Sequence, residues 1–214
     1  MALRWRLRVW PHASIDSTVK VIGWRQIALG RNVVLGARTW LNVNHRSGSS
    51  ISLSIGDNTY IGCDNFFSVG HSIILREYIL TTSRCAFIGS SHIYDNPAFH
   101  YAGTSTTADG QIYVGVNCFF GFGATVMGSA KIGHGCIIGA HSVVRGDVAP
   151  FSLVVGNPAR VVKHFDFVGQ KWVEGERPQN HAYPAEEAYL LSIWAETGFP
   201  FQPVSAATAR FGDI

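Results

Sequence analysis

The sequence predicts an all-β solenoid of parallel β-structure, and three features of a six-residue repeat support this prediction. Six consecutive hexads run without a gap from Val114 to Ala149. The first position of each hexad holds a large apolar residue, and the position four places later holds a small or slender one. Glycine follows the first position in four of the six hexads. A helix repeats apolar residues every three to four positions and an ordinary strand every two, so a strict period of six fits neither.

Each hexad is interpreted as one short strand plus one corner, with three hexads forming a triangular coil. The large positions, expected to fill the interior, are Val114, Phe120, Val126, Ile132, Ile138 and Val144. The small positions, expected to point inward nearer the corners, are Cys118, Ala124, Ala130, Cys136, Ser142 and Val148. The residue before each small position should often be left-handed, which favours Gly, Asn and Asp. These corner residues are Asn117, Gly123, Ser129, Gly135, His141 and Asp147, of which four fit.

Less regular hexads precede this block. The first of them start at Leu29, Leu35, Ile55 and Ile61, with corners at Asn32, Asn58 and Asp64. The register then slips by two residues and resumes at Val69, Leu75, Thr81 and Phe87. This slip predicts a bulge near Asn65–Ser68.

No period of six survives between Gly89 and Gln111. The stretch is polar, rich in Ser, Thr and aromatic residues, and carries two histidines. An insertion of this kind must leave the prism of a solenoid and project outward. Loops on rigid scaffolds often carry function, so this is the first candidate for a site.

The two ends of the chain differ from the repeat. The alternation of Arg and apolar residues over Arg4–Val9 predicts a half-buried leading strand, with a basic membrane-contact segment as the alternative. Pro184–Glu196 predicts a helix with Pro in its first turn, Glu186 and Glu187 near its positive end, and an apolar face. That face comprises Leu190, Ile193 and Trp194. The tail is expected to cap the solenoid or to contact a neighbouring subunit. The predicted domains are a solenoid over 1–164, including the loop 89–111, and a partly helical extension over 165–214.

Composition limits the possible functions. The chain has 214 residues, enough for one domain with a real core. Its 23 glycines and 14% charged residues suit tight β-structure rather than disorder. A formal charge of +3 does not predict nucleic-acid binding. The four cysteines form no CxxC pair, which favours reduced thiols and a cytoplasmic protein. No apolar run approaches the ~20 residues that span a bilayer, and no signal peptide is expected.

Three features together resemble the hexapeptide-repeat acyltransferases: the hexads, an excluded loop with GSSH at Gly89–His92, and VVGNPARVVK at Val154–Lys163. The chain is most similar to the sugar O-acetyltransferases of bacterial surface-polysaccharide biosynthesis, over roughly Leu29 to Lys163. The resemblance implies a left-handed parallel β-helix and a homotrimer with acetyl-CoA bound between prisms. It also implies transfer of an acetyl group to a hydroxyl of a sugar or glycan precursor, without a metal. The identity of that acceptor is not legible in the sequence.

The resemblance assigns the catalytic histidine to His92. An alcohol is a poor nucleophile near neutral pH, and an imidazole is a suitable general base for its attack on a thioester. Related proteins often carry an acid three places earlier, where this chain has Gly89, so Asp95 is a candidate to orient the ring. The positions that match the family's acetyl-CoA site are Phe119, Gly121, Phe122, Ala124, Ala140, Arg145, Arg160 and Lys163, the last three toward the phosphates. The acceptor would meet Tyr94, Asn96 and His100 of the loop.

Three alternatives stay open. The first is an N-acyltransferase that acts on an amino sugar. The second is a trimeric scaffold without catalysis. The third is a zinc enzyme of the carbonic anhydrase type, which would need His92, His134 and His141 to converge. His134 and His141 both fall at corners, where a solvent-facing side chain is expected. Binding of CoA would separate the transferase from the scaffold and the zinc enzyme.

Overall fold

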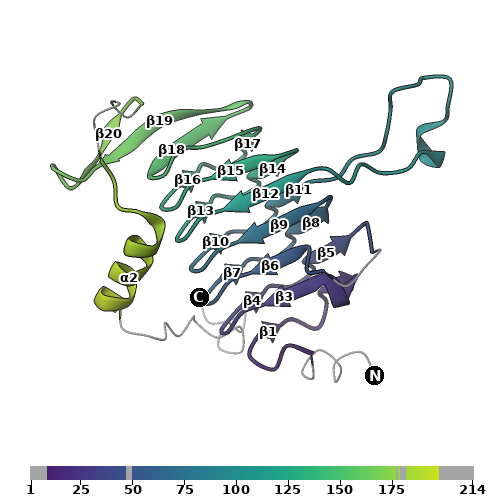
Figure 1. Cartoon of the computed structure of the whole chain (residues 1–214), viewed down its shortest axis with the longest axis horizontal. Helices are drawn as coiled ribbons and strands as arrows, with labels where there is room; N and C mark the ends of the chain where they lie inside the picture. The colour runs from purple at the N-terminus through teal and green to yellow at the C-terminus, as the bar shows by residue number, and fades with distance from the viewer. Residues whose placement is uncertain (1–8, 47–49, 177, 179–181, 198–214) are drawn as a thin grey trace, which may run out of the picture.

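The computed structural model describes residues 9–46, 50–176, 178 and 182–197, and its core is a left-handed parallel β-helix (Figure 1). Three parallel sheets, here called faces A, B and C, form the sides, and the chain visits them in that order in each coil. Face A contains β1 (Ser14–Ile15), β4 (Val34–Leu35), β7 (Tyr60–Ile61), β10 (Leu80–Thr81), β13 (Phe119–Phe120), β16 (Ile137–Ile138) and β18 (Ser152–Gly156). Face B contains β2 (Lys20–Ile22), β5 (Trp40–Val43), β8 (Phe66–Val69), β11 (Ala86–Ile88), β14 (Thr125–Met127) and β17 (Val143–Val144). Face C contains β3 (Ile27–Leu29), β6 (Leu53–Ile55), β9 (Ser72–Leu75), β12 (Gln111–Val114) and β15 (Ala130–Ile132).

The interior is filled as the hexads predict. All six large positions of the regular block are at most 2% exposed, and its small positions are buried as well. Phe67, Phe87 and Phe120 stack along the axis on successive coils, with ring centroids 4.9 and 5.1 Å apart. Stacked and edge-to-face rings at these distances add to the stabilisation from burial. The predicted fold class is therefore confirmed.

The interior cysteines are free thiols. Cys85, Cys118 and Cys136 are buried, and Cys63 is half-buried. Burial raises the pKa of the Cys85 and Cys118 thiols, which keeps them protonated and poorly nucleophilic. They serve as small inward-facing side chains rather than as reactive groups.

The left-handed corners agree with the prediction on two of the three edges. Asn117, Gly123, Gly135 and His141 have positive φ angles, as do the earlier corners Asn32, Asn58 and Asp64. Ser129 and Asp147 do not; their neighbours Gly128 and Gly146 take the left-handed conformation instead. Both exceptions lie on the edge between faces B and C. There a glycine stands one place earlier in the sequence and adopts positive φ without steric cost.

All of the departures from the period of six fall on this B–C edge. In each coil, one inward-facing residue precedes this edge on face B and another follows it on face C. The separation in sequence between the two is eight, fourteen, eight, twenty-seven and six positions in successive coils. The pairs are Val21 and Leu29, Leu41 and Ile55, Phe67 and Leu75, Phe87 and Val114, and Val126 and Ile132. A short 3₁₀ helix, η1 (Trp24–Gln26), occupies the first insertion. The largest insertion, residues 89–110, is the projecting loop, which contains η2 (Tyr101–Gly103) (Figure 1).

The predicted bulge near Asn65–Ser68 is wrong. Phe66, Phe67 and Ser68 pair in unbroken register with β5 on one side and β11 on the other. The two extra residues are Gly70 and His71, at the corner between β8 and β9. A bulge within a strand and a longer corner shift the repeat equally, so counting residues does not distinguish them.

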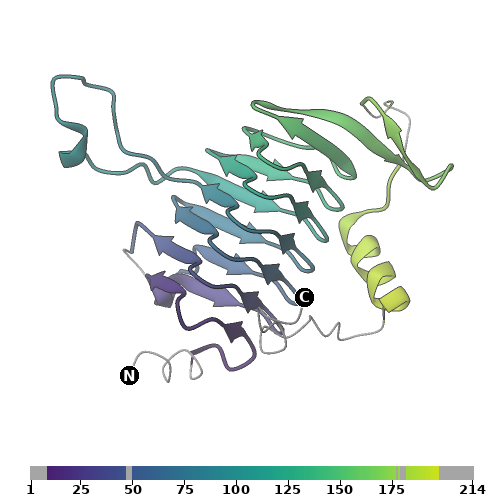
Figure 2. The ribbon, with the colours of Figure 1, turned by 180° about the vertical axis from the view of Figure 1, so that it is seen from behind.

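The C-terminal segment extends the end of the prism and then returns along its side. β18 continues face A and pairs antiparallel with β19 (Ala159–Asp166), which pairs with β20 (Lys171–Glu174). The predicted helix is present as α2 (Glu186–Thr197), starting two residues later than the predicted Pro184. Its buried residue is Leu190, one of the three predicted for the apolar face. The helix lies opposite the projecting loop (Figures 1 and 2).

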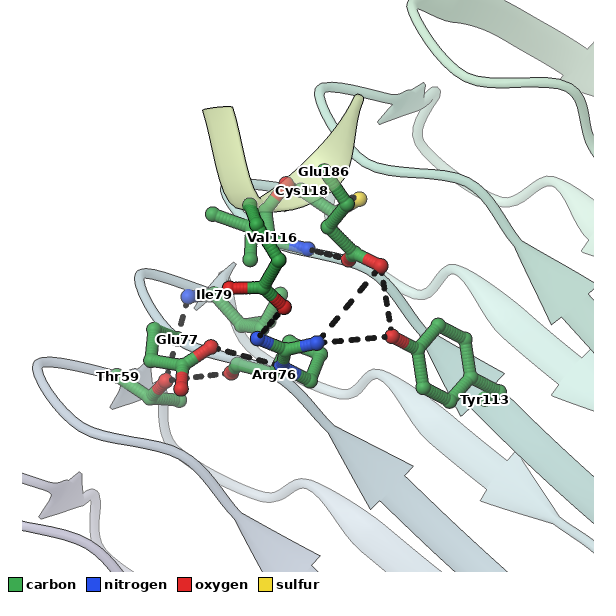
Figure 3. Close-up of polar contacts among 9 residues, drawn as sticks. Thr59, Arg76, Glu77, Ile79, Tyr113, Val116, Cys118 and Glu186 are labelled. Atoms are coloured by element: carbon green, nitrogen blue, oxygen red, sulfur yellow. Dashed lines mark hydrogen bonds and ion pairs between the residues drawn. The ribbon is translucent and has the colours of Figure 1, made fainter. Parts of the chain in front are cut away.

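A polar cluster fastens α2 to the edge between faces C and A (Figure 3). The Arg76 guanidinium contacts Glu77 at 2.9 Å, Glu187 at 3.0 Å and the Tyr113 hydroxyl at 3.3 Å. Glu186 accepts hydrogen bonds from the Val116 N–H and the Tyr113 hydroxyl, each at 2.8 Å. Burial lowers the pKa of Arg76, but its hydrogen bonds outweigh that effect and raise the pKa overall. The two glutamates predicted for the positive end of the helix thus also bind the prism.

Arg76→Met is expected to loosen α2, because it leaves three carboxylates facing one another without a cation. Arg76 is only 24% exposed, so we expect a loss of about 1–3 kcal/mol in the free energy of unfolding. Amide hydrogen exchange across residues 186–197 should accelerate in the same variant. Arg31→Met is the matched control, since its ion pair with Asp57 is 61% exposed on the arginine side and should contribute at most about 1 kcal/mol. Equal losses in the two variants would contradict the fastening role.

Two sequence predictions concern the ends of the chain and the membrane. The strand predicted over Arg4–Val9 lies outside the described residues except for Val9. Within the described part of the chain, no helix combines the length and apolarity needed to cross a bilayer.

Candidate active site

Three glycines from different segments meet where the loop leaves the prism. A Cβ atom on Gly70 or Gly110 would overlap the carbonyl oxygen of Gly89. A Cβ atom on Gly89 would lie 3.2 Å from the Gly110 oxygen, closer than an ordinary contact. The Gly89 N–H donates to the Ser68 carbonyl at 2.8 Å. Side chains are therefore excluded at positions 70 and 110, whereas a side chain at position 89 would require its neighbours to shift by a few tenths of an ångström.

The first part of the loop is a two-stranded stalk. Thr107 N–H donates to the Ser91 carbonyl at 2.7 Å, and Ile93 N–H donates to the Ser105 carbonyl at 2.9 Å. Between these bonds, His92 and Thr106 form an isolated antiparallel bridge. The backbone on both sides of His92 is therefore tied to the returning strand of the loop.

The His92 ring is held by Thr104. Its Nδ1 lies 3.3 Å from the Thr104 carbonyl oxygen and 3.4 Å from the Thr104 hydroxyl. A carbonyl only accepts, so this contact is a hydrogen bond when Nδ1 carries the ring proton. Nε2 then presents a lone pair on an exposed side chain, as a general base requires. Among the described contacts, the ring nitrogen that a carboxylate would orient in such a base contacts Thr104 instead.

The structure does not bring Asp95 to the His92 ring. Asp95 is exposed, and the described contacts of that ring are with Thr104. The other candidates on the loop lie farther along it. Tyr94 is 69% exposed, the Asn96 side chain accepts a hydrogen bond from Ala98 N–H, and the His100 ring lies against Gly103.

A hollow of about 610 Å³ opens beside the loop root on the B–C edge. Hydroxyl groups, glycine backbone and one residue of each charge line it. The residues that carry these groups are Ser90, Ser91, Tyr94, Thr107, Ser129, Asp109, Arg145, Gly89, Gly110, Gly128 and Gly146, and Ile88 and Met127 complete the lining. Sequence reasoning missed Asp109, which sits in the loop without a motif. The sequence also assigned Arg145 to the CoA phosphates together with Arg160 and Lys163. In the structure, Arg160 and Lys163 lie on β19 of face A instead, and Lys163 contacts Glu174 at 3.8 Å.

The other residues assigned to acetyl-CoA gather on the edge between faces A and B. They are Phe119, Gly121, Phe122, Ala124 and Ala140, contributed by successive coils. A Cβ atom on Gly121 would lie 2.7 Å from the Ala140 nitrogen, so the two corners stack through their backbones. Phe122 lies between the His141 ring at 5.3 Å and the Arg84 guanidinium at 5.4 Å. Arg84 was not among the sequence candidates.

The three histidines of the zinc alternative lie on different edges. His92 is on the loop of the B–C edge and His141 is exposed on the A–B edge. The prediction that His134 faces solvent is wrong, since it is 5% exposed and contacts Phe151, Tyr183 and Tyr189. Its Nε2 lies 2.9 Å from the Pro184 carbonyl. The returning C-terminal segment covers this corner. The hexad pattern does not predict that contact, because the segment lies outside the repeat. Among the described residues, no group of three or more His, Cys, Asp and Glu could hold a metal ion.

Comparisons with known proteins agree with the fold. The family model described as hexapeptide repeat of succinyl-transferase matches residues 111–146. A putative acetyltransferase of Staphylococcus aureus is 33% identical over 115 residues, which are 54% of this chain and 56% of that protein. The chain thus matches only about half the length of this curated relative.

Two solved structures share the architecture. One is AntD, an N-acyltransferase from Bacillus cereus, in complex with dTDP and 3-hydroxybutyryl-CoA; it has a TM-score of 0.63 and 14% identity over 87% of this chain and 88% of that one. The other is a hexapeptide-repeat acetyltransferase of Vibrio cholerae complexed with acetyl coenzyme A, with a TM-score of 0.53 and 23% identity over 65% and 70%. The hexads, the coil they form and these similarities support the resemblance of the chain to the hexapeptide-repeat acyltransferases.

Proposed function

We propose that this protein transfers an acetyl group from acetyl-CoA to a hydroxyl of a sugar or surface-polysaccharide precursor. The observation that carries the proposal is the geometry of His92. The ring stands on a braced stalk, its Nδ1 lies 3.3 Å from the Thr104 carbonyl oxygen, and its Nε2 carries a lone pair when Nδ1 holds the ring proton. The hydroxyl-rich hollow at the root of the same loop suits a polar, polyhydroxylated acceptor.

The proposed reaction is a direct displacement in a ternary complex. His92 Nε2 removes the proton from the acceptor hydroxyl as the oxygen attacks the thioester carbonyl. The carbon–sulfur bond then breaks, and the CoA thiolate leaves and takes up a proton. Backbone N–H groups near the thioester would stabilise the oxyanion that forms in between. No covalent enzyme intermediate is required.

The positions of the candidate residues favour a homotrimer with sites between subunits. The A–B edge, with Phe119 and Ala140, and the B–C edge, with His92, border opposite sides of face B. One chain therefore keeps the donor residues and the base apart. A second copy packed against face B would bring the donor edge of one chain toward the loop of the other. Arg160 and Lys163 on β19 are proposed to reach the CoA phosphates from face A.

The acceptor is proposed to contact the outer loop through Tyr94, Asn96 and His100. Because the solved N-acyltransferase shares the fold, an amino sugar is the alternative acceptor within the same chemistry. Assays with hydroxyl and amino acceptors in parallel decide between them.

Titration of the protein with CoA by calorimetry is expected to give saturable binding, which a scaffold would not show. Ala140→Glu places a charge on the exposed A–B edge, and it should weaken CoA binding roughly tenfold or more by blocking the corner and repelling phosphate. Ala195→Glu, the same change on an exposed position of α2, is the control and should bind normally. Equal affinity in all three proteins would place the donor site elsewhere.

A further inference from the structure

A smaller insertion on the B–C edge lies beneath the projecting loop. It follows β5, and its first residues are described. The Asn44 side chain donates to the Ser68 hydroxyl at 2.9 Å and to the Val69 carbonyl at 3.2 Å, and it accepts from Asn42 at 2.7 Å. These bonds tie the start of the insertion to the next coil, so the residue that follows Asn44 projects from a fixed base.

That residue, His45, reaches past the β8 coil to the stalk. Its Nε2 lies 2.9 Å from the Thr107 carbonyl and 3.3 Å from the Thr106 hydroxyl. The carbonyl accepts only, so Nε2 carries the proton and donates it. The side chain is half-buried, which shields the bond from competition with water.

Thr107 is the junction of the stalk. Its carbonyl also accepts from the Ser90 hydroxyl at 2.8 Å, and its own hydroxyl accepts from Ser91 N–H at 3.1 Å. The preceding residue, Thr106, is the bridge partner of His92. A shift of this returning strand would therefore move His92 and its Thr104 contact together.

We propose that His45 is a positioning residue that sets the orientation of His92 through Thr106 and Thr107. This inference rests on the proposed function, in which His92 is the base. Misplacement of a catalytic group by about 1 Å can reduce turnover by about 10²-fold. Loss of the single hydrogen bond from His45 to the stalk can therefore lower the rate of the reaction. His45 touches neither the acceptor nor the donor in this scheme, because its contacts are with the stalk.

Two substitutions at His45 separate the effect of its hydrogen bond from the effect of its side-chain volume. His45→Leu keeps the volume and removes the donor, whereas His45→Gln keeps an N–H donor at similar reach. His71→Leu is the matched control on the same edge, since the exposed His71 contributes its backbone N–H to Gly110 and that bond survives the change. Each variant is measured for kcat, KM for acetyl-CoA, hydrogen exchange of the stalk amides, and the His92 tautomer by ¹⁵N NMR.

In His45→Leu we expect kcat to fall roughly 10- to 100-fold with KM for acetyl-CoA nearly unchanged. The Ile93 and Thr107 amides should exchange about tenfold faster, and His92 should lose its preference for the Nδ1–H tautomer. His45→Gln should restore most of each property, and His71→Leu should behave as wild type. A purely structural role would lower stability without changing the tautomer.

The outcomes separate this inference from the proposed function. Unchanged exchange and an unchanged tautomer in His45→Leu would overturn the inference whatever the activity. Altered exchange with a wild-type kcat would overturn it too, because the stalk would then move without consequence for the reaction. If wild-type protein transfers no acyl group, the proposed function fails on its own, and the tautomer measurement still decides whether His45 orients His92.

Discussion

Replacement of His92 by alanine is expected to lower turnover by about 10²–10⁴-fold while leaving CoA binding nearly intact. The proposed role of the ring is to accept one proton from the acceptor hydroxyl as the thioester is attacked. Removal of the ring eliminates that acceptor but leaves the A–B edge, where the donor is proposed to bind, untouched. The measurement is kcat for acetyl transfer together with the calorimetric Kd for CoA.

Two comparisons make this test specific. His71→Ala removes a histidine of the same edge that lies outside the proposed chemistry, and its turnover should match that of the wild type. Thermal unfolding of His92→Ala should stay close to wild type, because the His92 side chain is exposed. An unchanged turnover in His92→Ala would exclude His92 as the base, and loss of both turnover and CoA binding would indicate a disturbed structure instead.

The prism was predictable because the residue pattern that specifies it is local in the sequence. Phe120 and Val126 face inward because each begins a hexad, and the parallel pairing then follows from stacking equal turns. The conformation of Ser129 and the location of the register slip were not predictable. A hexad count fixes which residues face inward but not which residue of a corner turns left, nor where two extra residues are accommodated.

Only part of the candidate site could be predicted from the sequence. His92 could be proposed because the period of six fails around it and the family resemblance assigns the catalytic histidine there. Asp109 could not be predicted because no motif surrounds it. Arg84 and His45 could not be predicted, because their side-chain contacts join segments far apart in sequence. His45, for example, reaches a residue 62 positions away. The same holds for Glu186, which follows helix-start rules locally and also binds a backbone N–H 70 residues earlier. Burial of His134 follows from that docking.

Phe120→Ala should strongly destabilise the prism. The ring is fully buried, and it packs edge-to-face on Phe87. Truncation of a buried phenylalanine removes apolar burial and leaves a cavity that a stack of short strands cannot close. We expect a loss of about 3–5 kcal/mol in the free energy of unfolding, measured by chemical denaturation.

Phe119→Ala is the matched control, because it removes the same ring from the adjacent residue of the same strand, β13. Its side chain is 37% exposed on the outer surface of face A, so the loss should be smaller, roughly 1 kcal/mol. Phe120→Ala alters the inward side of this two-residue strand, and Phe119→Ala alters its outward side. If Phe119→Ala proved as costly as Phe120→Ala, either face A would be covered in the assembled protein or the inward row would be assigned to the wrong residues. Denaturation at several protein concentrations separates these cases, because burial against a second copy makes the loss depend on concentration.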